Sequence, residues 1–289
     1  VKLLVTPELG VTGYTCGDLF LQKRLIDRAR DSIAEIAAET ADLGCVLVVG
    51  APLRFGTSLY NCSVVMLNGQ ILGVVPKKNL PNYGEFYELR QFSPAPDSKE
   101  LLTVELCGQY VPFGTKIIFR CEGMPEFAFG CEICEDLWVP EPPSTKLALN
   151  GATIICNLSA SDETVGKASY RRELVKSQSA RLICGYIYAD AGCGESTTDM
   201  VFAGHDLIGE NGSLLAESKP FENSLDEEGK VACPMVVTEI DVQKLVAERT
   251  RMKTFDGCTS FSERSDAFDV SFEMEISDTE LTRKFEPQP

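Results

Sequence analysis

Histidine is almost missing from this chain, which has a single one, His205, in 289 residues. It alternates with apolar neighbours in Phe202-Ala203-Gly204-His205, as a solvent-facing position of a strand does. A histidine is the usual base beside a catalytic serine or cysteine, and it is the commonest metal ligand. The shortage disfavours a Ser/His/Asp site, a Cys/His site and a histidine-based metal site. Any acid-base chemistry must then come from glutamate and lysine.

Basic residues and long apolar runs are also scarce. The chain has 27 Lys and Arg against 43 Asp and Glu, a net charge of -16. Such a charge repels phosphate backbones and acidic membrane surfaces, so we expect no nucleic-acid partner, although an acidic balance most often means only a solvated surface. No apolar run approaches the roughly 20 residues that cross a bilayer, so we expect no membrane span. At 44% hydrophobic residues, the chain can bury one large core.

Cysteine, in contrast, is abundant, with twelve residues scattered mostly through apolar segments. Without a secretory leader we read them as reduced, buried, small hydrophobes of a cytoplasmic protein. Cys131 and Cys134 form the only Cys-x-x-Cys. A thioredoxin-like dithiol stays open for this pair, although two residues three apart in a strand face opposite sides. A metal site would need a second such pair, so we expect no metal.

Cys134 ends a β-prone run that begins at Phe127, and two acids, an aromatic residue and a Pro-rich turn follow it. This order is typical of a strand that delivers a nucleophile to a strand-to-helix bend. Two other apolar runs end in a charge, at Glu8 and at Lys77. Charged residues at strand ends can meet at one rim of a sheet. There a carboxylate can take the thiol proton, and an ammonium can stabilise a thiolate and an oxyanion.

The pattern therefore predicts a site made of Glu8, Lys77 and Cys134. Three plainer interpretations remain open at this point. Cys134 can be an inert buried thiol, Glu8 a surface acid at a strand end, and Lys77 one of two adjacent solvated lysines.

The secondary structure that the sequence predicts repeats itself: a strand with a charged or reactive end, a helix, a strand and an Asn-Gly hairpin. In the first half these are a strand at 2–8, a helix at 18–43, a strand at 45–49 and a hairpin around Asn68-Gly69. In the second half they are strands at 127–134, 153–158 and 183–189, helices at 144–150 (capped by Ser144) and at 170–182 (basic residues exposed), and a hairpin of 198–208 with 213–219. Two such halves predict an α-β-β-α sandwich with a site at their junction.

The end of the chain differs from the rest. A strand from Val236 leads into a helix at 241–252, and residues 258–289 are rich in Asp, Glu, Ser and Thr. They alternate apolar and polar residues at 267–276 but have little with which to form a core of their own. We predict one domain at 1–257, followed by an acidic linker at 258–289.

Three segments resemble the carbon-nitrogen hydrolase (nitrilase) superfamily. They are Pro7-Glu8-Leu9, Pro76-Lys77-Lys78-Asn79-Leu80-Pro81 and Glu132-Ile133-Cys134-Glu135-Asp136-Leu137-Trp138. Together with residues 139–144, 157–161 and 192–199, the chain is more closely similar to the glutaminase domain of glutamine-dependent NAD synthetases, over roughly residues 1–257. Three motifs in the right order are more specific than a lone short pattern. The resemblance implies the same sandwich fold, and we expect its usual first strand and helix to be missing before Val1.

The resemblance also implies catalytic roles. Glu8 would accept the proton of Cys134, and the thiolate would attack the side-chain amide of glutamine. Lys77, the lysine directly after the proline, and the backbone N–H of Glu135 would hold the oxyanion. Glu88 would be the second glutamate, which positions the lysine.

Two further points concern the substrate pocket. By resemblance Tyr83 closes over the glutamine and Ser161 with Lys167 contacts its amino-acid end, while Tyr14 and Glu135 line the pocket. Relatives often carry arginine where this chain has Lys167. For Glu88, an exposed acid on a helix surface, paired with Arg90, remains the alternative.

The partners that the resemblance implies lie outside this chain. The ammonia would serve a synthetase domain or subunit that uses ATP and Mg to convert deamido-NAD to NAD. Its phosphate-binding Ser-Gly-Gly motif is absent from this sequence, so we expect no cofactor in this chain. Nitrilase-like domains tend to associate, so we expect a homo-oligomer. A free-standing amidase or nitrilase acting on another substrate, and a catalytically silent scaffold subunit, are the alternatives.

Overall fold

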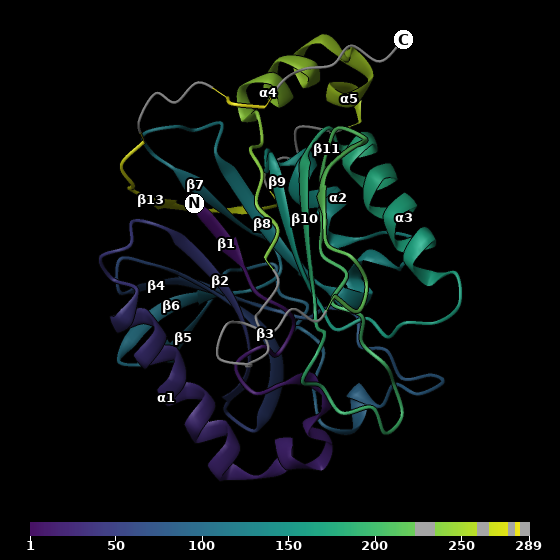
Figure 1. Cartoon of the computed structure of the whole chain (residues 1–289). Helices are drawn as coiled ribbons and strands as arrows, with labels where there is room; N and C mark the ends of the chain where they lie inside the picture. The colour runs from purple at the N-terminus through teal and green to yellow at the C-terminus, as the bar shows by residue number, and fades with distance from the viewer. Residues whose placement is uncertain (223–234, 259–265, 277–280, 284–289) are drawn as a thin grey trace.

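The computed structural model describes residues 1–222, 235–258, 266–276 and 281–283. Two sheets lie face to face, with helices on their outer sides (Figure 1). The six-stranded sheet has the order β1-β2-β3-β4-β6-β5, and the seven-stranded sheet has the order β12-β11-β10-β9-β8-β7-β13. Helix α1 covers the first sheet, and α2 and α3 cover the second. The α-β-β-α sandwich predicted from the sequence is confirmed.

The first sheet consists of β1 (Leu3–Val5), β2 (Val46–Phe55), β3 (Ser58–Leu67), β4 (Gln70–Pro76), β5 (Leu102–Leu106) and β6 (Gln109–Phe113). The second consists of β7 (Ile117–Cys121), β8 (Ala128–Ile133), β9 (Ile154–Ser159), β10 (Gly185–Asp190), β11 (Leu207–Glu210), β12 (Ser213–Glu217) and β13 (Phe268–Phe272). The helices are α1 (Lys23–Glu39), α2 (Pro143–Leu149), α3 (Lys167–Leu182), α4 (Val242–Arg251) and α5 (Lys253–Gly257). Three 3₁₀ helices cover Tyr14–Leu21, Glu88–Arg90 and Cys134–Leu137.

The main core fills the space between the two sheets. Val48 on β2 and Val75 on β4 belong to it, as do Phe129 on β8 and Cys156 on β9. Because side chains alternate along a strand, Cys131 also points into this core, opposite Cys156 in the parallel β8–β9 pair. The inner faces of the sheets are thus mostly apolar.

Several predicted elements have different bounds in the structure. The single helix expected at 18–43 is divided: residues 18–21 belong to the 3₁₀ helix, Gln22 has extended backbone, and α1 then runs from Lys23 to Glu39. The strand expected from residue 198 begins only at Leu207, and residues 235–240 form no strand. Helix α2 follows Pro142 as its N-cap, so Ser144 is not the cap but lies inside the helix.

The end of the chain adds a strand to the second sheet. β13 pairs in parallel with β7, and the ring of Phe272 lies 5.8 Å from that of Phe127 in the core between the sheets. The expectation of a linker is wrong for this segment, because its alternating apolar residues extend an existing core and need none of their own. The predicted boundary at 257 stays a prediction, and 259–265, 277–280 and 284–289 lie outside the described residues. Within the part of the chain that the structure describes, no helix is both long enough and apolar enough to cross a membrane.

Candidate active site

Cys134 lies directly after β8 and opens the 3₁₀ turn Cys134–Leu137. Its φ of +43° is in the left-handed region, which residues other than glycine rarely adopt. Asp136 stabilises the turn, since its Oδ2 accepts the N–H of Ile133 at 3.0 Å. A bent junction of this kind presents one side chain at the rim of a sheet. The backbone thus takes Cys134 out of the strand, while Cys131 stays in the core.

The buried Asp136 also connects this turn to the loop that follows Lys77. Its Oδ1 accepts hydrogen bonds from the backbone N–H and from the side-chain amide of Asn79, both at 2.8 Å. Burial raises the pKa of Asp136, and the N–H groups of Ile133 and Asn79 work against this rise. Asp136 was not among the site residues predicted from the sequence. The sequence feature that could have predicted its role is an acid two residues after the cysteine, where the first turn of a helix can be capped.

Lys77 extends from the end of β4 and is fully buried. Its Nζ donates to Oε1 of Glu8 and to Oε1 of Glu88, each at 2.6 Å. Burial alone would lower the pKa of Lys77, but the two carboxylates outweigh it and the pKa lies well above its ordinary value. The lysine is therefore a permanent cation between two acids. The readings of Lys77 as a solvated lysine and of Glu8 as a surface acid are wrong.

Glu8 is held by groups from both sheets. Besides Lys77, the side-chain amide of Asn61 on β3 donates to its Oε1 at 2.6 Å, and the N–H of Ala160, just after β9, donates to its Oε2 at 2.9 Å. On β2, Gly50 makes room for the Glu8 loop, because a Cβ there would lie 2.5 Å from the backbone of that loop. Asn61 was not among the site residues predicted from the sequence. The sequence feature that could have predicted it is a side-chain amide within a mostly apolar strand.

Glu88 completes the charged group. Its Oε1 also accepts a hydrogen bond from the hydroxyl of Tyr14 at 2.8 Å. Burial raises the pKa of Glu88, with Lys77 opposing the rise and Glu8 adding to it. Burial and the same two glutamates raise the pKa of Tyr14. Arg90 pairs instead with the exposed Asp18, so the alternative of a surface Glu88–Arg90 pair is wrong.

The thiol of Cys134 is buried in the field of these groups. Burial has the largest effect and raises the pKa of the thiol; Glu8 adds to the rise, and Lys77 opposes it. The N–H of Ala160 also opposes it. The sulfur therefore keeps its proton in the resting site and needs a base. Glu8, which accepts the N–H of Ala160, is the carboxylate with the larger effect on the pKa of this thiol.

Two polar pairs lie around this centre. The exposed Tyr83 donates its hydroxyl to the half-buried carboxylate of Glu135 at 2.9 Å. Lys167 forms an ion pair with Asp162, and its ammonium lies 5.4 Å from the centre of the Trp138 ring. Acidic and basic groups are thus both available for a zwitterion. Neither Trp138 nor Asp162 was among the site residues predicted from the sequence.

A family model described as carbon-nitrogen hydrolase matches residues 1–248 of this chain. The chain belongs to the carbon-nitrogen hydrolase family. It is similar to the glutamine-dependent NAD(+) synthetase of Mycobacterium tuberculosis, with 47% identity over 254 residues that cover 88% of this chain and 36% of the relative. The human glutamine-dependent NAD(+) synthetase is 31% identical over 230 residues, which cover 76% of this chain and 31% of the relative. The chain therefore spans about a third of the length of these curated relatives.

Solved structures agree with this assignment. A glutamine-dependent NAD(+) synthetase from Cytophaga hutchinsonii matches with a TM-score of 0.67 and 33% identity, over 76% of this chain and 35% of that one. A carbon-nitrogen hydrolase from Helicobacter pylori G27 matches with a TM-score of 0.66 over 91% of this chain and 84% of that one. At 17% identity, the second match shows the fold alone.

His205 does not have the place in this carbon-nitrogen hydrolase that the sequence suggested. It is fully buried, because residues 202–205 form a loop and not a solvent-facing strand. Its Nε2 lies 2.7 Å from Glu217 Oε1, and its Nδ1 lies 2.9 Å from an NH1 of Arg171. Among the described residues, no group of three or more His, Cys, Asp or Glu side chains is arranged to hold a metal ion.

Proposed function

We propose that this carbon-nitrogen hydrolase splits the side-chain amide of glutamine into ammonia and glutamate. The observation that carries the proposal is the buried Lys77 between Glu8 and Glu88, in the field of which the Cys134 thiol lies. A base, a permanent cation and a nucleophile are the parts that acyl transfer from an amide needs.

The proposed reaction begins when Glu8 accepts the proton of Cys134 and the sulfur bonds to the amide carbon. Lys77 and the N–H of Glu135 stabilise the oxyanion of the tetrahedral intermediate. Glu8 then returns the proton to the leaving nitrogen, the C–N bond breaks, and ammonia leaves a thioester. A water molecule, deprotonated by Glu8, attacks the thioester, and glutamate leaves as the sulfur regains its proton. Glu88 positions Lys77 throughout.

The charged groups around the centre fit the amino-acid end of glutamine. Lys167 and Ser161 suit the carboxylate, and Glu135, with Tyr83 bonded to it, suits the ammonium. Tyr14 lies deeper, where it supports Glu88.

We further propose that the ammonia is used by a synthetase domain or subunit. The relatives named glutamine-dependent NAD(+) synthetase are roughly two and a half times as long as this chain. In this proposal the synthetase uses ATP and Mg to convert deamido-NAD to NAD, and the protein is a cytoplasmic homo-oligomer. Glutamine hydrolysis that rises when a synthetase domain is added would support the coupling, and an unchanged rate would contradict it.

The test of the chemistry is the rate of ammonia release from glutamine by Cys134→Ala. We expect the rate to fall to background, because no other group in the site replaces the sulfur. Cys131→Ala is the matched control and should keep most of the activity, since Cys131 belongs to the core between the sheets. Wild-type ammonia release by Cys134→Ala would refute the proposal.

Two other results would point to the alternatives. Hydrolysis of simple carboxamides without hydrolysis of glutamine would assign a free-standing amidase. Failure of a glutamine-like electrophile to label Cys134 would favour a silent scaffold subunit.

A further inference from the structure

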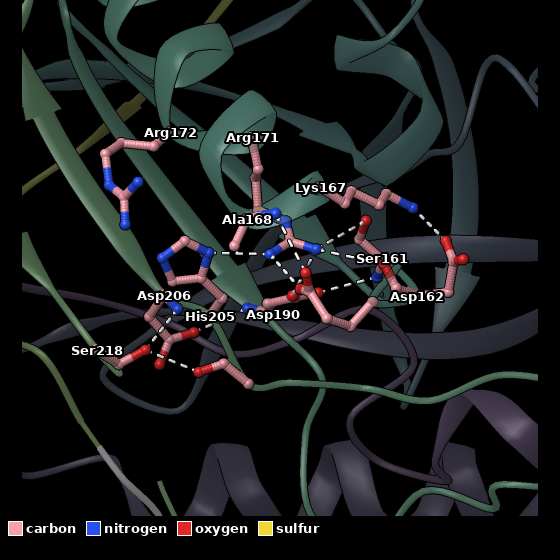
Figure 2. A network of polar contacts seen from close by, with 12 residues as sticks. Ser161, Asp162, Lys167, Ala168, Arg171, Arg172, Asp190, His205, Asp206 and Ser218 are labelled. Atoms are coloured by element: carbon pink, nitrogen blue, oxygen red, sulfur yellow. Dashed lines mark hydrogen bonds and ion pairs between the residues drawn. The ribbon is translucent and has the colours of Figure 1, made fainter. Parts of the chain in front are cut away.

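Arg171 on α3 is a wholly buried arginine, although the sequence predicted exposed basic residues on this helix. Its guanidinium lies beside Ser161 (Figure 2), the first residue of the segment 161–163, which follows β9. NH2 donates to Ser161 Oγ at 3.4 Å and to the carbonyl of Asp162 at 3.3 Å, and NH1 donates to Glu163 Oε2 at 3.0 Å. One side chain thus bonds to three successive residues.

The other side of the guanidinium meets the body of the domain. NH1 lies 2.9 Å from His205 Nδ1, and NH2 lies 3.8 Å from Asp190 Oδ2 at the end of β10. Asp190 in turn accepts the N–H of Ser161 at 2.9 Å. Because a guanidinium can only donate, His205 Nδ1 must accept, so this imidazole is neutral and carries its hydrogen on Nε2, toward Glu217. Arg171 therefore joins the segment to fixed parts of the sheet.

The segment contains groups on which the proposed site depends. Its first neighbour, Ala160, donates its N–H to Glu8. Ser161 and the Asp162–Lys167 ion pair lie where we place the amino-acid end of the substrate. Since Arg171 donates to Ser161 Oγ, the hydroxyl hydrogen of this serine stays available to donate to an anion.

We propose that Arg171 is a positioning residue for the amino-acid end of the substrate: it orients Ser161 and the backbone of Asp162 without touching the substrate. This inference rests on the proposed function. A planar fork of donors is needed to reach acceptors on several sides at once, and a lysine ammonium in the same place reaches fewer of them. Binding of the substrate's carboxylate should suffer from the replacement, while the chemistry at Cys134 should not.

The first experiment compares Arg171→Lys with the wild type in glutamine hydrolysis. We expect KM to rise about tenfold, as for the loss of about 1.4 kcal/mol of binding, and kcat to change by less than about threefold. Arg249→Lys is the matched control. Arg249 donates to four backbone carbonyls at the ends of α2 and α3, so this variant should lose stability and keep its KM.

The second experiment separates recognition from reactivity at the sulfur. Inactivation by a diazoketone analogue of glutamine, which carries the amino-acid end, should slow about tenfold in Arg171→Lys, as KM does. Inactivation by iodoacetamide, which lacks that end, should keep its rate. Equal slowing with both reagents, or a fall in kcat as large as the rise in KM, would mean a merely structural role and overturn the inference.

The third experiment asks whether Arg171 acts through Ser161. If it does, KM of the double variant Arg171→Lys/Ser161→Ala should not exceed that of the worse single variant, and a product of the two effects would overturn the inference. If Arg171→Lys does not fold, Glu163→Ala, which removes the guanidinium's carboxylate partner on the segment, takes its place in all three comparisons with the same expected results. A wild type that neither hydrolyses glutamine nor reacts with its analogue would refute the proposed function. If the wild type does both, and the Arg171 variant has the same KM for glutamine and the same preference for the diazoketone over iodoacetamide, the inference alone is refuted.

Discussion

Lys77→Met should damage both the stability and the activity of this carbon-nitrogen hydrolase. In the structure one ammonium lies 2.6 Å from each of two buried carboxylates, so the three groups together carry a charge of about -1 when all are ionised. Replacing the lysine by a methionine of similar length leaves Glu8 and Glu88 facing each other without a cation. Their ionised forms then have neither water nor a counter-charge.

The size of the effect follows from this geometry. Removing one partner of a buried ion pair destabilises a protein by about 3–5 kcal/mol, which for a domain of this size corresponds to a fall in Tm of roughly 6–20 °C. Losing one oxyanion donor should lower the rate of glutamine hydrolysis at least ~10²- to 10³-fold. Adding Glu88→Gln to Lys77→Met removes one of the two uncompensated charges. The double variant should therefore regain part of the Tm and none of the activity.

Thermal unfolding and the initial rate of ammonia release, both at pH 8, measure these effects. Lys78→Met is the matched control, because Lys78 is the exposed neighbour in the sequence and contributes its backbone N–H to the site. It should keep the Tm and most of the rate. Lys77→Met with a wild-type Tm, or Lys78→Met as inactive as Lys77→Met, would refute the reasoning.

Three further predictions concern other parts of the molecule. Burial raises the pKa of Glu132 to about 7. Because this folded-state pKa lies above the unfolded one, the free energy of unfolding falls as pH rises through 7. Glu132→Gln should therefore reduce the loss of unfolding free energy between pH 5 and 8 by up to about 3 kcal/mol, and an identical pH dependence of the two proteins in denaturant titrations would contradict this. Tyr83→Phe, which removes the hydroxyl that bonds to Glu135, should raise KM for glutamine a few-fold, and an unchanged KM for Tyr83→Ala would exclude Tyr83 from the pocket. Phe272→Ala should cost about 3–5 kcal/mol in urea unfolding, and a loss below ~1 kcal/mol would show that β13 adds little to the core.

The sequence was informative where local chemistry decides the structure. Asn68-Gly69 and Asn211-Gly212 predicted hairpins, and all four residues have positive φ, as a two-residue turn of this kind requires. Glu8 and Lys77 were visible because each charge ends an apolar run, and the ends of such strands meet at a rim.

The sequence was uninformative where burial depends on partners far along the chain. Arg171 and His205 look like surface residues locally, and only the carboxylates of Glu163 and Glu217 and the end of β10 make their burial possible. Asn61 is a similar case, because its partner Glu8 comes from another strand. The alternation around Phe272 predicted a strand but not its neighbour, since pairing with β7 is a property of the assembled sheet.

Gly50 has no functional group, yet it controls where the proposed base sits. The Glu8 loop rests on its bare backbone on one side and is tied to the opposite sheet through Ala160 on the other. A methyl group at position 50 would therefore push the Glu8 loop away from β2, and the distances from Glu8 to Asn61 on β3 and to Lys77 after β4 would change with it. The position of Glu8 thus depends on the absence of a side chain at residue 50 as much as on the groups that bond to its carboxylate.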